Sequence, residues 1–214
     1  MTTPEPSIKQ AKVLVAEGKD ECELALAVLA SLKLTDVQVI DGKGKDNLKS
    51  RIKQAFKEPA FPDVTHFAIF LDADGSYQDC FKSIAHLFNE RKLPFPEQGK
   101  LSSEKDGFRT SIWISPDNAS AGMLEDMFLH CIADEPLVAM ATSFVEQLAE
   151  KYPSTTESGK FGVPSHKCKA ISHACLTATN GPLKHLGVSA KTGHWDVQHD
   201  RLKAFRDFLS QAFS

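Results

Sequence analysis

The chain has 214 residues, of which 42% are hydrophobic and 25% are charged, a composition typical of a folded globular protein. The formal net charge of −3 excludes the overall basic character that drives tight non-specific nucleic-acid binding, although a local basic face is still allowed. No run of about 18 apolar residues is present, and MTTPEPSIKQ has no apolar signal region, so we expect no membrane span and a cytoplasmic location.

Strands and helices are predicted to alternate through the first half of the chain. Short apolar or β-branched runs predict strands at 12–16, 36–41, 66–71 and 110–115. Apolar residues at helical spacing predict helices at 20–32, 46–57 and 76–89. This alternation is typical of βαβ units, so the expected fold class is α/β, with a four-stranded parallel sheet and helices on both faces.

The second half is predicted to be helical. Apolar spacing indicates helices at 123–132, 136–151, 166–179 and 200–213, and the Gly- and Pro-rich stretch 152–164 is expected to be a loop. Phe161 and Trp195 fall in irregular segments and are expected to anchor them. We therefore expect an α/β core at 10–118 and a helical C-terminal part at 119–214 that packs on it as one compact unit.

Acidic residues follow three of the four predicted strands. Glu17 ends the first strand in VLVAEGKDE, Asp72 and Asp74 end the third in AIFLDADGS, and Asp117 follows the fourth. The carboxyl ends of parallel strands share one edge of a sheet, where ligands bind. Carboxylates gathered there repel one another unless a cation joins them. Oxygen ligands without nearby His or Cys favour Mg²⁺ or Mn²⁺ over zinc.

Two alternatives stay open at this edge. Asp and Gly are common at strand ends because they form turns and cap helices, which explains each acidic residue without a metal. The side chains of Asp72 and Asp74 would point the same way if the backbone stayed extended, whereas a turn at 73–75 would separate them.

The glutamate after the first strand and the DxD after the third resemble the motifs of the Toprim domain of topoisomerases, primases and OLD-type nucleases. EGKDE, LDADG, WISPDN, GMLEDMFL and GHWD further resemble a family of small stand-alone Toprim-related proteins. The resemblance implies that Glu17 is a general acid/base and that Asp72 and Asp74 hold Mg²⁺ in phosphodiester chemistry on nucleic acid. It also allows Glu125 and Asp126 to hold a second ion, or to be first-turn residues of a helix.

The reaction stays open, because parts of these enzymes are missing from the sequence. There is no room for a topoisomerase's tyrosine-bearing domain or a primase's template-binding module, and no GxxxxGK[ST] motif of an ATPase. A partner protein is therefore a serious alternative source of specificity, and the oligomeric state is undetermined.

Two other functions are compatible with the same residues. AIFLDADGS resembles the first motif of haloacid-dehalogenase-type phosphatases, in which Asp72 would be the nucleophile and Asp74 the acid/base. That motif normally ends the first strand of its domain, whereas here it ends the third. A non-catalytic phosphate- or nucleotide-binding module, or a partner-interaction module, would use loop lysines instead. Its candidate phosphate contacts are Lys19, Lys43 and Lys45, which could equally be solvated.

SHKCKAISHAC offers His and Cys for a zinc site. However, Cys168, Ile171 and Cys175 share one helical face, which favours core packing.

Overall fold

The structure is a computed structural model that describes residues 7–152, 166–179 and 185–214. Its centre is a five-stranded sheet in the order β2-β1-β3-β5-β4. The strands are β1 (Lys12–Ala16), β2 (Val37–Asp41), β3 (His66–Asp72), β4 (Ser102–Lys105) and β5 (Phe108–Ser115). All four predicted strands are present and mutually parallel, which confirms the α/β class.

The prediction of four strands is wrong by one, because β4 adds an antiparallel edge strand paired with β5. Its sequence, SSEK, is short and polar and therefore lacks the apolar alternation that marks a buried strand. The hairpin signal is Asp106–Gly107, where both residues have positive φ as a two-residue turn requires.

Eight α-helices are found in the described residues. They are α1 (Lys19–Ser31), α2 (Lys45–Ala55), α3 (Tyr77–Glu90), α4 (Leu124–Cys131), α5 (Pro136–Lys151), α6 (Lys167–Thr177), α7 (Leu186–Lys191) and α8 (Lys203–Phe213). All predicted helices are present, α7 was not predicted, and short 3₁₀ turns lie at Phe61–Asp63 and Asp200–Leu202. Phe161 and most of the predicted loop lie outside the described residues.

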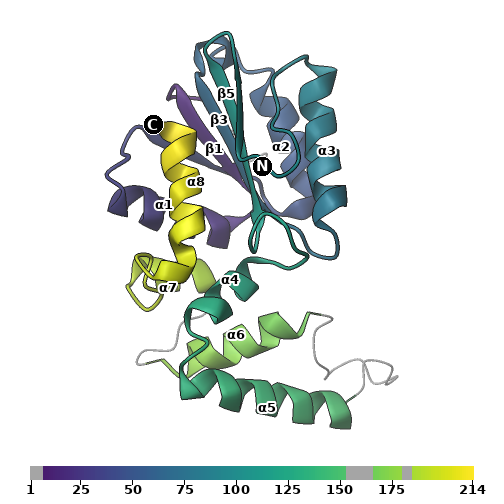
Figure 1. Cartoon of the computed structure of the whole chain (residues 1–214), viewed down its shortest axis with the longest axis vertical. Helices are drawn as coiled ribbons and strands as arrows, with labels where there is room; N and C mark the ends of the chain where they lie inside the picture. Colours follow the sequence, from purple (N-terminus) through teal and green to yellow (C-terminus); the bar gives the residue numbers. More distant parts are fainter. Residues whose placement is uncertain (1–6, 153–165, 180–184) are drawn as a thin grey trace, which may run out of the picture.

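The sheet separates two apolar cores, because successive side chains of a strand point to opposite faces. In β1, Val13 and Val15 enter one core, whereas Leu14 and Ala16 enter the other. Helices α2 and α3 cover the first face, and α1 and α8 cover the second (Figure 1). Strands buried on both faces explain why the predicted strand runs are apolar almost throughout.

The C-terminal helix α8 belongs to the core of the sheet. The ring of Phe205 lies 4.8 Å from that of Phe70 in β3 and 5.4 Å from that of Trp113 in β5. Lys12 at the start of β1 also donates its ammonium to the carbonyl of Phe213 at 2.7 Å. Helices α5 and α6 pack on each other farther from the sheet (Figure 1). The division at residue 118 stays a prediction.

Trp195 lies just after α7 and is fully buried, as expected for an anchor. Its ring meets that of Phe128 in α4 edge-on, with centroids 5.4 Å apart. Trp195 thus ties the C-terminal segment to the helix that follows the sheet.

Candidate functional site

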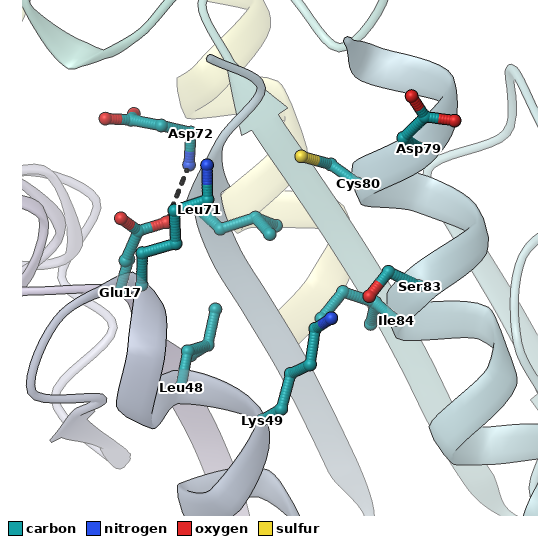
Figure 2. A pocket seen from close by; sticks show the side chains of 10 residues that line it. Glu17, Leu48, Lys49, Leu71, Asp72, Asp79, Cys80, Ser83 and Ile84 are labelled. Atoms are coloured by element: carbon teal, nitrogen blue, oxygen red, sulfur yellow. Dashed lines mark hydrogen bonds between the residues drawn. The ribbon is translucent and has the colours of Figure 1, made fainter. Parts of the chain in front are cut away.

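The ends of β1 and β3 bring Glu17 and Asp72 together. The two strands are adjacent and parallel, with Ala16 opposite Phe70. The amide of Glu17 donates to the carbonyl of Phe70 at 2.8 Å, and the amide of Asp72 donates to Glu17 Oε2 at 3.3 Å. Figure 2 shows both carboxylates at the end of the strands, on the side away from Cys80 and Ser83.

The loop after β2 holds the Glu17 backbone from the other side. The amide of Gly42 donates to Ala16 O at 2.7 Å, and that of Gly44 donates to Glu17 O at 2.8 Å. A Cβ atom at Gly42 would lie 2.7 Å from Ala16 O and 2.8 Å from Glu17 O, closer than real Cβ contacts. Glycine is therefore required at position 42 for this close approach.

The two aspartates of the DxD diverge. Strand β3 ends at Asp72, and Asp74 adopts a φ of 49°, so the turn alternative is the one found. The backbone of Asp74 forms a bridge with Gly122, and its carboxylate pairs with the ammonium of Lys45. The carboxylate of Asp72 instead accepts from the amide of Leu124, at the start of α4, at 2.9 Å.

Asp72 lies in an acidic environment and is only 7% exposed. Burial raises its pKa well above the usual range, and the neighbouring carboxylates of Glu21, Glu17, Glu125 and Asp74 raise it further. Each of these charges disfavours ionisation of the others. The end of β3 is thus a place where several carboxylates gather.

Glu17 is itself affected by this environment. Burial raises its pKa, and the amide of Asp72 opposes that rise by donating to the ionised carboxylate. The charge of Asp74 raises the pKa further, whereas the ammonium groups of Lys45 and Lys169 lower it. Lys169, on α6, was not predicted from the sequence to lie near this site.

Glu21 was missed as a member of this cluster. It is 8% exposed, and burial together with the charges of Glu17, Asp20 and Glu125 raises its pKa to about 7. Helix α1 begins at Lys19, so Glu21 falls in its first turn, four residues after Glu17. The signal was in VLVAEGKDE, because a helix that begins just after Gly18 turns this residue back toward the sheet edge.

The other predicted metal ligands are placed differently. Asp117 caps its own turn, accepting from the amides of Ala119 at 3.0 Å and Ser120 at 2.7 Å. Asp126 accepts from the amide of Met123 at 2.8 Å, in the local capping contact of α4. Glu125 is half-buried, and burial raises its pKa. The structure therefore places Glu125 in the cluster, whereas Asp117 and Asp126 accept hydrogen bonds from backbone amides within three residues of themselves.

The three lysines also have separate placements. Lys45 pairs with Asp74, and Lys43 pairs with Asp41 at 2.7 Å. Lys19 is exposed at the first residue of α1 and has no ion pair within the described residues. Of these lysines, only Lys45 therefore contacts an acidic residue predicted for the site.

A divalent cation fits the donor chemistry of this edge. All donors are carboxylate oxygens, which Mg²⁺ and Mn²⁺ prefer, and their mutual repulsion is what a cation relieves. In the described ranges, no three His, Cys, Asp or Glu side chains are already gathered as a metal site. Asp72 and Asp74 would therefore have to reorient from their present partners, Leu124 and Lys45, to share an ion.

Helix α6 matches the packing interpretation of SHKCKAISHAC at Ile171 and Cys175, whereas Cys168 is only half-buried and does not belong to the apolar core. Cys175 is buried in the core beside the sheet, and Ile171 packs against that core. Across the parts of the chain that the structure describes, no helix is long and apolar enough to span a membrane.

A pocket of about 230 Å³ adjoins Glu17 and Asp72 on the side of α2 and α3. Helix α2 contributes Lys45, Leu48 and Lys49 to it, and Cys80, Ser83 and Ile84 come from α3. Figure 2 shows the side chains of Lys49 and Ser83 pointing toward each other across the space between these helices.

Comparisons with known proteins give one family and a group of solved structures. The model of the family described as "Protein of unknown function (DUF3226)" matches residues 11–214. No curated protein sequence matches the chain.

The C-terminal region of the Burkholderia pseudomallei OLD protein is similar at 13% identity and a TM-score of 0.48, over 97% of this chain and 100% of that one. The C-terminal region of the Xanthomonas campestris pv. campestris OLD protein is similar at 11% identity and a TM-score of 0.47, over 95% of this chain and 96% of that one. At these values neither structure bears on function, which must be argued from the side chains.

Proposed function

The chain belongs to the DUF3226 family, and we propose that it carries out phosphodiester chemistry on nucleic acid with the help of a divalent cation, Mg²⁺ or Mn²⁺. In this proposal Asp72 and Asp74 hold the cation and Glu17 transfers the proton. Glu125, whose charge raises the pKa of Asp72, is the candidate for a further ligand. Asp117 and Asp126 would serve only if they left their local caps.

The observation that carries the proposal is the buried carboxylate of Asp72. It lies among four other acidic side chains, and its pKa is raised by burial and by their charge. A chain that needed only a turn or a cap at this position would not need such a concentration of negative charge. A site that binds a cation gains affinity from this negative charge, because the cation removes the repulsion between the carboxylates.

Glu17 suits proton transfer for two reasons. Its pKa is raised, which moves it toward neutral pH, where a general acid/base works best. It also lines the pocket beside the sheet edge, where we propose that the substrate binds. When bound, a divalent cation would supply charge stabilisation at the phosphate.

The resemblance of EGKDE and LDADG to the Toprim motifs supports the same assignment of roles. The phosphatase alternative needs Asp72 as an ionised and accessible nucleophile. Asp72 is instead buried, accepts from the amide of Leu124, and has a raised pKa. Both roles need the ionised carboxylate, but the phosphatase alternative leaves Glu17, whose carboxylate accepts from the amide of Asp72, without a function. The metal-ligand role is therefore the one we propose.

The test is titration of Mg²⁺ and Mn²⁺ into the wild type, Asp72→Asn and Asp46→Asn, followed by thermal unfolding with and without metal. Asp46 is an exposed carboxylate in the first turn of α2 and serves as the matched control. We expect Asp72→Asn to lose the metal-dependent rise in unfolding temperature and Asp46→Asn to keep it. Equal metal binding by wild type and Asp72→Asn would show that the metal assignment is wrong.

Activity is tested separately by incubating wild type and Glu17→Gln with single- and double-stranded DNA and RNA in the presence of either metal. We expect cleavage by the wild type and a loss of at least about 100-fold in Glu17→Gln, the usual size of a general acid/base contribution. Metal binding without cleavage of any strand would instead favour the non-catalytic module or a partner-dependent enzyme. Turnover of a phosphomonoester dependent on Asp72 would favour the phosphatase.

A further inference from the structure

The pocket between α2 and α3 combines an apolar wall with charged side chains. Its inner wall is apolar, formed by the buried side chains of Leu48, Leu71 and Ile84. Two ammonium groups, those of Lys45 and Lys49, stand four residues apart on α2 and line the same space. One end of the pocket opens at Glu17 and Asp72, where the proposed chemistry takes place.

We infer that this pocket holds one nucleotide of a single-stranded nucleic acid, next to the phosphodiester that reacts at Glu17. The choice of a nucleotide rests on the proposed function. Apolar walls with a few polar groups are typical of sites for small organic ligands. The apolar wall would take the face of the base, and the ammonium of Lys49 would take the backbone phosphate.

The size of the pocket favours a single strand. Its volume of about 230 Å³ is below the range of roughly 300 to 1,000 Å³ usual for drug-sized ligands. A single unstacked base can enter such a space, whereas a base pair within a duplex cannot leave its stack without an energetic cost. Strand ends and unpaired segments are therefore the substrates that the pocket fits.

The charges around the pocket are arranged for this ligand. Lys49 has no ion pair within the described residues, so its ammonium is available to a phosphate. Lys45 is held by Asp74. Asp79, on the α3 side, also lines the pocket, and a carboxylate there can accept from an exocyclic amino group of a base.

The experiment measures binding without metal or cleavage, so that it is independent of the catalytic test. A fluorescently labelled adenine homopolymer and an abasic strand with the same number of phosphates are titrated with the full chain at low salt, in EDTA. We expect the intact strand to bind about tenfold more tightly, because only it can bury a base against the apolar wall. Equal binding of the two strands, or no binding of either, would overturn the inference.

Two substitutions and one control test whether the preference arises in the pocket. Ser83→Phe fills the pocket and is expected to abolish the preference for the intact strand, while the metal-dependent stabilisation persists. Lys49→Ala is expected to weaken binding of both strands, whereas Lys53→Ala, one turn farther along α2 and outside the pocket, leaves both unchanged. A preference that survives in Ser83→Phe overturns the assignment, and if that variant does not fold, the comparison of the two lysine variants decides.

The two proposals can fail separately. If Asp72→Asn binds Mg²⁺ like the wild type while the intact strand is still preferred, the pocket is supported and the proposed function is wrong. If metal binding and cleavage depend on Asp72 and Glu17 but both strands bind equally, the proposed function stands and the nucleotide pocket is wrong.

Discussion

Replacing Glu21 with Gln should make the metal-free protein more stable at alkaline pH. Glu21 is 8% exposed, and its pKa is raised from 4.5 to about 7 by burial and by the surrounding carboxylates. The folded chain therefore holds this proton more tightly than the unfolded chain does. A group of this kind contributes stability that is fully present below pH 4.5 and is lost as the pH rises through about 7.

The size of the effect follows from the same pKa. A rise from 4.5 to about 7 corresponds to about 3 kcal/mol of unfolding free energy. Glutamine cannot ionise, so Glu21→Gln should abolish this part of the pH dependence. At pH 8 in EDTA the variant should exceed the wild type by up to about 3 kcal/mol, reduced by any hydrogen bond that the amide cannot make.

Urea unfolding in EDTA at several pH values between 4 and 9 measures this difference. Glu146→Gln, on the exposed surface of α5, is the matched control and should follow the wild type throughout. If the Glu21→Gln and wild-type stabilities fall in parallel from pH 4.5 to 7, Glu21 does not carry the raised pKa. The argument that Glu21 adds to the negative charge around Asp72 would then fail.

Changes at three further positions test the site and the core by urea unfolding, together with Mg²⁺ titration for the second. In EDTA, Asp72→Asn should be at least as stable as the wild type, because the side-chain oxygen of asparagine still accepts from the amide of Leu124. Asp72→Ala should lose about 1–2 kcal/mol of unfolding free energy. Equal stabilities of the two variants would contradict the role of that hydrogen bond. Gly42→Ala should lower the unfolding free energy by about 1–3 kcal/mol and weaken Mg²⁺ binding, because the added methyl group collides with the backbone of Ala16 and Glu17. Unchanged stability and metal binding would show that this loop relaxes freely. Trp195→Ala should cost about 3–5 kcal/mol, as for other fully buried aromatic residues, and a loss below 1 kcal/mol would show that Trp195 is not an anchor.

The sequence determined most of the fold. Strands buried on both faces must be apolar throughout, so KVLVA and HFAIFL were recognisable without the structure. The parallel order of these strands then required their carboxyl ends to share an edge, which brought Glu17 and Asp72 together. By contrast, β4 is short, polar and at the edge of the sheet, so it lacks the apolar pattern of the other strands, and only the Asp106–Gly107 turn marks its hairpin in the sequence.

The tertiary structure decided the details of the site. Whether Asp72 and Asp74 point the same way depends on the backbone at residue 74, where a φ of 49° separates them. Lys169 reaches the cluster because α6 is held there by long-range packing, which local periodicity cannot express. Burial raises the pKa of Asp72, and burial is a property of the whole fold. The sequence therefore supplies the residue types of the site, and the packing decides the pKa of each carboxylate.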